Sequence, residues 1–248
     1  MKRIVFPETW TADEWYGFTR HHFDFEGCKA WIVEPKYPAG DGRWSWCTVW
    51  PEAFVSRVGI PALLEHGFYH AHVDAYKTSA SPEGIAIMRH FHDILVGLGL
   101  SPKANLIGMS WGGFFSLRYA EENPQHVAAI YLDAPVCDAA DRNPCAADRL
   151  EMICKNYGLT PEQLDKSPLN PINNLKPLVD NKIPMMASTG EDDLVVLVKD
   201  NINIVEARLK ELGYTFPIMR RPAWGHHPHG RDDVKSLLDF HFAAREIQ

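Results

Sequence analysis

The sequence has few cysteines, no excess of basic residues and no long hydrophobic run. Its five cysteines are an odd number without the close spacing of a metal site, so we expect reduced, mostly buried thiols rather than a disulfide framework. Lysine and arginine together number 25, against 32 for aspartate and glutamate, which gives a net charge of −7. This balance provides no basic surface for nucleic acid or anionic lipid, and we expect neither as a partner.

The hydrophobic runs are too short for a membrane-spanning helix or a signal peptide. Near the start, two basic residues precede a short apolar run that ends at Pro7 and Glu8. A membrane-spanning helix needs about 20 mostly apolar residues, and the apolar part of a signal peptide needs about 7–15. We therefore expect a cytoplasmic protein without a membrane partner.

The 248 residues, 46% of them hydrophobic and 23% charged, are enough for a large core, and we expect one α/β domain over 1–248. An antiparallel hairpin, strands 18–25 and 29–34, comes first. Strand and helix patterns then alternate, which predicts a mostly parallel sheet covered by helices on both faces. The expected strands are 44–50, 68–76, 104–107, 127–132, 185–189 and 216–220, and the expected helices are about 52–66, 82–97, 200–212 and 232–244. A further helix is expected after Ser110, where apolar residues have helical spacing until Asn123-Pro124 stops it.

This alternation lapses between residues 134 and 182. The stretch is rich in Pro, Asn and Asp and contains only short helical patterns. Long connections at the edge of a sheet often carry function. We therefore predict a lid or cap insertion at 134–182.

The stretch NLIGMSWGG, residues 105–113, places Ser110 between two glycines. The apolar run before it is typical of a buried parallel strand, and apolar residues at helical spacing follow it. A sharp turn between a strand and a helix holds a serine hydroxyl clear of the backbone, and the flanking glycines permit such a turn. We interpret Ser110 as a nucleophile, with an ordinary Gly-Ser turn as the alternative until partners are found.

A serine nucleophile needs a histidine base, and that histidine needs a carboxylate to fix its tautomer. The stretch STGEDDLVV, residues 188–196, follows a predicted strand, so its carboxylates lie where open α/β sheets place catalytic groups. Asp193 and Asp192 are the candidates, with Glu191 as the less favoured third, and Asp133, at the end of another strand, is the second choice. A helix cap or a local turn would favour aspartate at 192 and 193 as well.

For the base, the stretch RRPAWGHHPHG, residues 220–230, follows the last predicted strand and offers His226, His227 and His229. Only one of two adjacent side chains in such a loop can point into the site, and Gly225 allows the backbone to turn just before His226. We favour His226, with His227 next. The cluster could instead bind zinc, but no further ligand stands beside it at metal-site spacing.

Three segments together resemble the α/β-hydrolase superfamily: Gly108-Met109-Ser110-Trp111-Gly112, Gly190-x-x-Asp193-x-x-Val196 and the loop 225–229. The resemblance covers roughly residues 18–245, and the order serine, acid, histidine is the one found in that superfamily. It implies Asp193 as the acid and His226 as the base. The stretches DAPVCD, 133–138, and GHHPH further resemble a group of bacterial α/β-hydrolases that tend to accompany carbohydrate-degrading enzymes.

The sequence has no His-Gly-Gly-Gly motif to mark the oxyanion hole. One donor should be the N–H of Trp111, the residue after the nucleophile, and the second should come from the loop after strand 44–50. Pro51 has no N–H. We expect Trp50 as the second donor, with Glu52 as the alternative.

Five of the eight tryptophans fall on segments that the predicted site brings together: Trp44, Trp46, Trp50, Trp111 and Trp224. Indole faces suit stacking on sugar or aromatic rings. We therefore expect Trp44, Trp46 and Trp224 to bind substrate. The alternation of Trp44, Trp46 and Trp50 on one face of the strand fits a tryptophan-rich core equally well.

These residues predict a serine hydrolase of carboxylic esters acting on small-molecule or saccharide esters. Ser110 would attack the acyl carbon, His226 would carry the proton to the leaving alcohol, and Asp193 would orient His226. This mechanism implies no metal and no organic cofactor. A peptidase or an acyltransferase with the same three residues is the alternative, as is a non-catalytic binding module of this fold.

Overall fold

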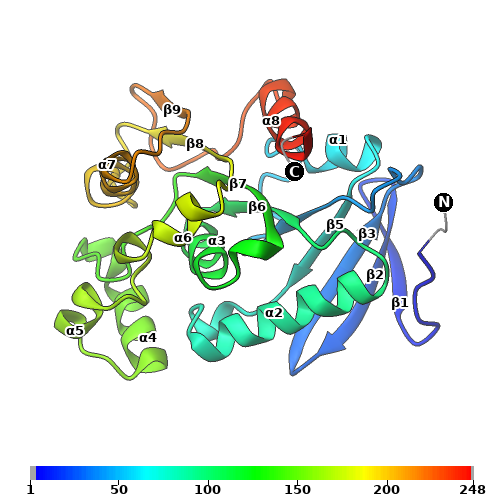
Figure 1. Ribbon diagram of the computed structural model, residues 1–248, viewed down its shortest axis with the longest axis horizontal. Coiled ribbons are helices and arrows are strands. Elements are labelled where there is room, and N and C mark those ends of the chain that lie inside the picture. Colours follow the sequence, from blue (N-terminus) through cyan, green and yellow to red (C-terminus); the bar gives the residue numbers. More distant parts are fainter. Residues whose placement is uncertain (1–3, 247–248) are drawn as a thin grey trace.

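The computed structural model describes residues 4–246; the two ends of the predicted domain, 1–3 and 247–248, lie outside the described residues. Its centre is a nine-stranded mixed sheet in the order β1-β2-β3-β5-β4-β6-β7-β8-β9 (Figure 1). The pairs along β1-β2-β3-β5 are antiparallel and those along β5-β4-β6-β7-β8-β9 are parallel. The strands are β1 (Thr11–Trp15), β2 (Phe18–Phe25), β3 (Cys28–Glu34), β4 (Trp44–Cys47), β5 (Tyr69–Val73), β6 (Ala104–Met109), β7 (Val127–Asp133), β8 (Met185–Gly190) and β9 (Ile218–Arg221).

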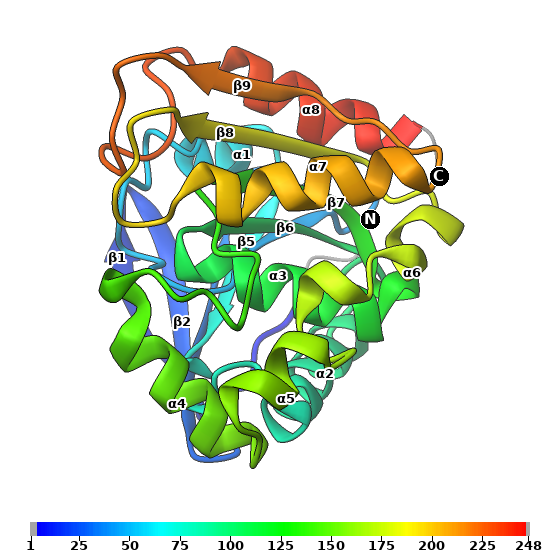
Figure 2. The ribbon, with the colours of Figure 1, turned by 90° about the vertical axis from the view of Figure 1, so that its left-hand side faces the viewer.

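Helices cover both faces of the sheet, and a hydrophobic core lies on each face (Figures 1 and 2). The buried residues of α2, α3 and α7 belong to one core, and those of α1 and α8 belong to the other. The helices are α1 (Ile60–Glu65), α2 (Pro82–Gly97), α3 (Trp111–Glu122), α4 (Ala147–Tyr157), α5 (Pro161–Lys166), α6 (Lys176–Asp180), α7 (Ile202–Glu211) and α8 (Lys235–Glu246), with short 3-10 turns at Tyr76–Thr78, Pro124–His126, Pro144–Ala146, Pro171–Asn173 and Val198–Asp200.

The predicted mostly parallel sheet with an N-terminal antiparallel hairpin is confirmed. Helix α2 begins and ends where the sequence predicts, because Pro82 fits the first turn and the Ser81 side chain accepts a hydrogen bond from the N–H of Gly84 (3.3 Å). In the segment 134–182 the structure has α4, α5 and α6 (Figure 2). Whether this segment acts as a lid stays a prediction.

Two predicted elements differ most from the structure, and one strand was not predicted. The strand predicted at 44–50 ends at Cys47, because Thr48 turns its N–H to the carbonyl of Ile107 and Trp50 adopts a positive φ of 61°. The helix predicted over 52–66 is helical only in α1, since turns occupy the residues before it. Strand β1, at the edge of the sheet, was not predicted; its residues are mostly exposed and lack a strong apolar pattern.

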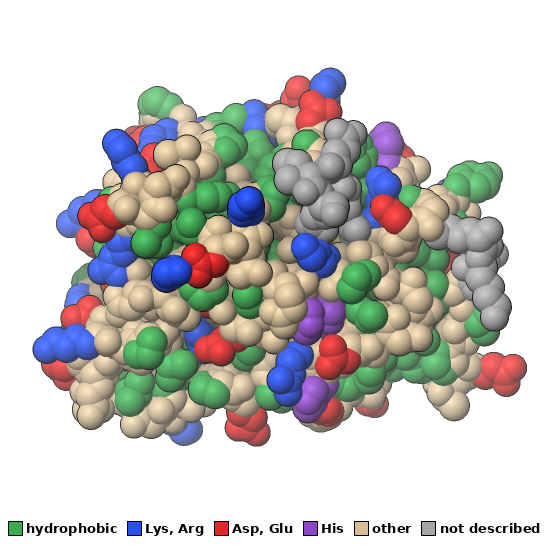
Figure 3. All heavy atoms as spheres, viewed as in Figure 1, with side chains coloured by type: hydrophobic (Ala, Val, Ile, Leu, Met, Phe, Trp, Pro, Cys, Tyr) green, Lys and Arg blue, Asp and Glu red, His purple; other side chains and the backbone are tan. Residues whose placement is uncertain are grey.

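Acidic and basic side chains are interspersed on the face shown in Figure 3. Among the residues that the structure describes, none of the helices combines the length and the apolar character needed to cross a membrane.

Candidate active site

Ser110 occupies the sharp turn between β6 and α3. Its φ of 50° and ψ of −118° lie in a region that few non-glycine residues adopt. Its N–H donates to the carbonyl of Asp133 (2.8 Å), and its carbonyl accepts from the N–H groups of Gly113 (3.0 Å) and Val136 (2.9 Å). A side chain at Gly108 would overlap the first turns of α3. The expected strand-to-helix turn is therefore present and is held by its neighbours.

The structure brings Ser110, His226 and Asp193 into one hydrogen-bonded chain. Nε2 of His226 lies 2.9 Å from Oγ of Ser110, and Nδ1 of His226 lies 2.6 Å from Oδ2 of Asp193. His226 and Asp193 are buried, and Ser110 is partly exposed. An imidazole held in this way can accept the proton of the hydroxyl while the carboxylate fixes its tautomer.

The Asp193 carboxylate is fixed by its own loop. Its Oδ1 accepts hydrogen bonds from the N–H groups of Val195 and Val196, both 2.8 Å long. Burial acts to raise the pKa of Asp193, but the hydrogen bonds from His226 and from these N–H groups outweigh it, and the pKa is lowered. Asp193 is therefore a carboxylate at neutral pH. Asp192, the other candidate, is exposed.

The loops that carry the acid and the base are joined to each other. The N–H of Glu191 donates to the carbonyl of Arg221 (3.0 Å). A side chain at Gly190 would overlap the carbonyl oxygens of Trp224 and Gly225, so only glycine allows this close approach. The distance between Asp193 and His226 is thus set by the backbone as well as by their side chains.

A second buried Asp–His pair lies beside the first and was not predicted. Oδ1 of Asp133 accepts a hydrogen bond from Nδ1 of His229 (2.8 Å), and Oδ2 accepts from the N–H of Gly230 (3.0 Å) and the hydroxyl of Tyr131 (2.5 Å). Arg221 Nη2 lies 3.7 Å from the same carboxylate. Asp133 is therefore engaged with His229 and not with His226. No local pattern reveals this pair, because 96 residues separate its members.

The two predicted oxyanion-hole residues lie on segments that touch. Trp111 is the first residue of α3, and the first N–H groups of a helix have no partner within it. Trp50 follows β4, where Oγ1 of Thr48 donates to the carbonyl of Gly112 in the first turn of α3 (2.8 Å). The loop after β4 therefore runs against the start of the helix that Ser110 precedes.

Trp44 and Trp46 lie in the core, so they cannot bind substrate as the sequence predicts. Both side chains are 0% exposed and stack on each other in the core under α2 and α3. Nε1 of Trp44 donates to the carbonyl of Ser101 (2.9 Å). Trp224 is half-buried within its own loop, where Nε1 donates to the carbonyl of Pro228 (3.3 Å).

A cleft of about 540 Å³ opens beside the contact between the β4 loop and α3. Three aromatic side chains line it together with charged side chains of both signs: Trp31, Trp50, Tyr76, Glu52, Asp74 and Lys77. The Trp50 side chain is 44% exposed, and its ring lies 5.5 Å from that of Tyr76. Only Trp50 and Glu52 were singled out in the sequence. Asp74 directly follows β5, so the position of strand ends could have revealed it.

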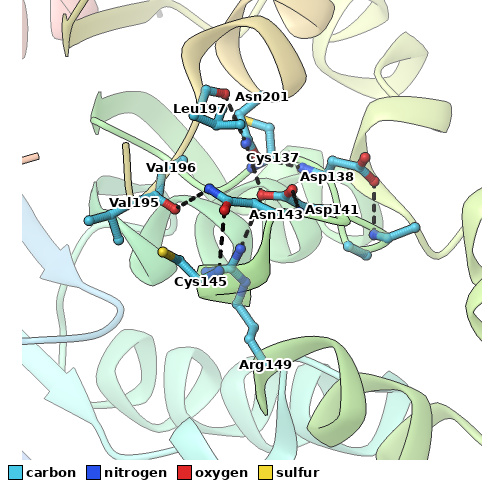
Figure 4. Close-up of polar contacts among 12 residues, drawn as sticks. Cys137, Asp138, Asp141, Asn143, Cys145, Arg149, Val195, Val196, Leu197 and Asn201 are labelled. Carbon is cyan, nitrogen blue, oxygen red and sulfur yellow. Dashed lines mark hydrogen bonds and ion pairs between the residues drawn. The ribbon is translucent and has the colours of Figure 1, made fainter. Parts of the chain in front are cut away.

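The segment 134–182 is hydrogen-bonded to the acid loop (Figure 4). Nδ2 of Asn143 donates to the carbonyls of Leu194 (3.1 Å) and Val195 (3.2 Å). Oδ1 of the buried Asn201 accepts from the N–H groups of Cys137 (2.8 Å) and Asp138 (3.1 Å). Two asparagine side chains thus join the insertion to both ends of the stretch that follows Asp193.

Arg149, on α4, lies over the ring of Trp111. Its guanidinium lies 5.5 Å from the centre of the Trp111 ring and donates to Oδ2 of Asp141 (3.3 Å). Burial lowers the pKa of Arg149, and the charge of Asp141 acts against this. The insertion therefore places a cation against the residue that follows Ser110.

A family model described as alpha/beta hydrolase fold matches residues 10–151. The chain belongs to this family. The α/β-hydrolase is similar in structure to an esterase/lipase from an uncultured bacterium, with a TM-score of 0.64 and 16% identity over 97% of this chain and 85% of that one. It is also similar to the thermophilic esterase Est2 of Thermogutta terrifontis, with a TM-score of 0.58 and 18% identity over 90% of this chain and 88% of the other.

Peptidases share the fold as well. The Pyrococcus horikoshii acylaminoacyl peptidase has a TM-score of 0.63 and 14% identity over 84% of this chain, and this chain spans only 37% of its length. At such identities the likeness concerns the fold. No curated protein matches the sequence.

Proposed function

We propose that this α/β-hydrolase is a serine hydrolase of carboxylic esters. The observation that carries the proposal is the chain of contacts from Oγ of Ser110 through His226 to Asp193, with distances of 2.9 and 2.6 Å. Such a chain activates a hydroxyl that is otherwise a poor nucleophile at neutral pH. The partly exposed hydroxyl of Ser110 is open to a substrate, while the acid and the base are kept from water.

In the proposed mechanism, Oγ of Ser110 attacks the acyl carbon and Nε2 of His226 takes its proton. The N–H of Trp111 and one N–H of the loop after β4, that of Trp50 or Glu52, stabilise the negative charge on the carbonyl oxygen. His226 then gives the proton to the leaving alcohol, and an acyl-enzyme remains. A water molecule, deprotonated by His226, releases the acid and restores Ser110.

We propose a carbohydrate as the alcohol or acid part of the ester. Support comes from the cleft lined by the loop after β4, where the exposed ring of Trp50 lies near Tyr76 and among charged side chains. Sugars present an apolar face that stacks on aromatic rings and hydroxyl groups that bond to charged residues such as Glu52 and Asp74. We therefore propose that Trp50, and not Trp44 or Trp46 as predicted, is the tryptophan that stacks on the substrate.

We propose that residues 134–182 form a cap that stays attached to the site. The support is the pair of asparagine contacts, Asn143 with the acid loop and Asn201 with the start of the insertion. Arg149 then lies over the Trp111 ring as a fixed side chain of the cap.

The proposed function is tested with a panel of acetylated, methyl-esterified and feruloylated saccharides beside short p-nitrophenyl esters and the matching amides. We expect hydrolysis of esters, loss of several orders of magnitude in kcat for Ser110→Ala, and labelling of Ser110 by a fluorophosphonate. Faster turnover of the amides would identify a peptidase, and transfer of the acyl group to added alcohols would identify an acyltransferase. Full activity of Ser110→Ala would refute the proposal.

A further inference from the structure

Three imidazole rings gather beside the nucleophile. His226, His227 and His229 each offer one ring nitrogen, and these three atoms lie within 4.8 Å of one another. Each pair of rings is 4.8 or 4.9 Å apart between centres and close to perpendicular. The proposed mechanism uses only His226, so the other two imidazoles need a different explanation.

Two of the three rings are oriented by buried carboxylates. Nδ1 of His226 bonds to Asp193 (2.6 Å) and Nδ1 of His229 bonds to Asp133 (2.8 Å). Histidines that bind metals in proteins commonly give their other nitrogen to a carboxylate, which fixes the tautomer and raises the basicity of the free nitrogen. In both residues Nε2 is the nitrogen that does not face the carboxylate, and in His226 this Nε2 contacts Oγ of Ser110 (2.9 Å). Asp193 and Asp133 also place a negative charge behind each ring. The charge of Asp133 is shared with Arg221, whose Nη2 lies 3.7 Å away, so Asp193 is the carboxylate that most favours a cation.

The third ring is accessible. His227 is exposed and packs its face on Phe54, with ring centres 5.6 Å apart. It lies on the same short loop as the other two, so an ion arriving from solvent meets His227 first. The loop therefore holds two imidazoles, those of His226 and His229, whose orientation is fixed by carboxylates. The third imidazole, that of His227, is exposed and can change its orientation to meet an ion.

We propose that a divalent transition-metal ion of the zinc type binds His226, His227 and His229 and reversibly inhibits the enzyme. Zinc accepts imidazole nitrogens at about 2.0–2.1 Å in a tetrahedron, which sets ligand nitrogens about 3.4 Å apart. The ligand nitrogens now lie within 4.8 Å of one another, so they must approach one another by at most about 1.4 Å. A water molecule supplies the fourth ligand. Magnesium and calcium prefer oxygen ligands and are not expected to bind here.

Inhibition follows from the nitrogen that the ion occupies. Nε2 of His226 is the atom that contacts Oγ of Ser110, and one lone pair cannot serve the metal and the serine proton together. A bound ion thus removes the base without touching Ser110. This consequence rests on the proposed function, whereas binding of the ion does not.

Binding is tested by calorimetric titration of zinc chloride into protein freed of metal with a chelator. We expect zinc to bind, with a loss of affinity of at least about tenfold at this site in His227→Gln and in His229→Gln. Any zinc bound at the second group of possible ligands, His92, Asp93 and His126, should be unchanged in both variants. His66→Gln is the matched control, because it removes an exposed histidine that is distant in the sequence from residues 226–229. It should bind zinc as the parent does. Because His227 is exposed, its variant should fold normally even if the His229 variant does not. Parent-like binding in His227→Gln would overturn the proposal.

Inhibition is tested by the rate at which a fluorophosphonate labels Ser110, a readout that needs no knowledge of the substrate. Zinc should slow the labelling of the parent and of His66→Gln, a chelator should restore it, and magnesium should have no effect. His227→Gln should be labelled at the parent's rate without zinc and should need at least about tenfold more zinc to be slowed. Zinc that binds but leaves labelling unchanged would overturn the assignment of His226 as a ligand.

Discussion

The backbone N–H of Ser110 donates a 2.8 Å hydrogen bond to the carbonyl of Asp133. The side chain of the same aspartate accepts hydrogen bonds from His229 and Gly230, in the loop that carries His226. One buried residue therefore joins the turn at Ser110 to the loop that carries His226. We infer that Asp133 is a positioning residue.

Asp133→Asn tests this role. The asparagine keeps the shape but puts an NH₂ group where a carboxylate oxygen accepts hydrogen bonds. We expect the free energy of unfolding to fall by about 2–3 kcal/mol, because buried donors lose their acceptor. We also expect kcat to fall less than in Asp193→Asn. Urea denaturation and ester hydrolysis measure the two effects; unchanged stability with a complete loss of turnover would make Asp133 part of the proton path instead.

Asp193 and Asp192 form a matched pair for testing the acid. Asp193→Asn presents the wrong hydrogen-bonding group to Nδ1 of His226 and should cost roughly 10⁴-fold in kcat. Asp192→Asn changes an exposed side chain and should leave kcat near that of the parent. Steady-state kinetics on one p-nitrophenyl ester compares them, and equal losses in the two variants would contradict the assignment of Asp193.

The base is tested by the adjacent histidines. His226→Ala should lose about as much kcat as Ser110→Ala, and the double variant should be scarcely worse than either single variant, because the residues act as one unit. His227→Ala should retain normal turnover, since its side chain is exposed. Loss of turnover in His227→Ala with near-normal turnover in His226→Ala would identify His227 as the base instead.

Two buried histidines make the fold sensitive to acid. Burial lowers the pKa of His70 and of His241 to about 3, whereas in the unfolded chain the pKa is about 6.5. Between these values the unfolded chain binds protons that the folded chain does not. The stabilisation is therefore complete above about pH 6.5 and is lost as the pH falls toward 3, by up to about 1.4 kcal/mol per pH unit for each histidine.

His241→Gln tests this dependence. The variant should show a shallower decrease in the free energy of unfolding between pH 6.5 and 4.5, by up to about 1.4 kcal/mol per unit. His66→Gln, an exposed histidine, should keep the slope of the parent. The measurement is urea denaturation at several pH values, and identical slopes in all three proteins would show that His241 does not titrate differently on folding.

The sequence predicts the parts of the site that local patterns encode. The turn at Ser110 needs small flanking residues between a strand and a helix, and these are consecutive in the chain. The order of the strands places Asp193 and His226 at the same edge. What local patterns miss are contacts across the chain: the pair of Asp133 and His229 depends on the register of β7 beside β6 and on the path of the last loop.

The tryptophans show a second limit. A period of two would put Trp44, Trp46 and Trp50 on one face if the strand continued. The strand ends at Cys47 and the chain turns, so Trp44 and Trp46 enter the core while Trp50 reaches the cleft. Because helices cover both faces of the sheet, neither face of β4 is open to a ligand. An alternating pattern does not reveal where a strand ends. Here the position of the strand end determines that Trp50, and not Trp44 or Trp46, is open to a ligand.

The amide of Asn143 and the buried side chain of Asn201 also bear on how this chain could be recombined with its relatives. They join residues 137–143 to the stretch that begins at Leu194. A chimera that replaces residues 134–182 but keeps the native stretch after β8 would lose the Asn143 side chain, which binds the carbonyls next to the N–H groups that hold Asp193. Crossover points should therefore lie before residue 134 and after residue 201, so that 134–182 and Asp193 are inherited as one block.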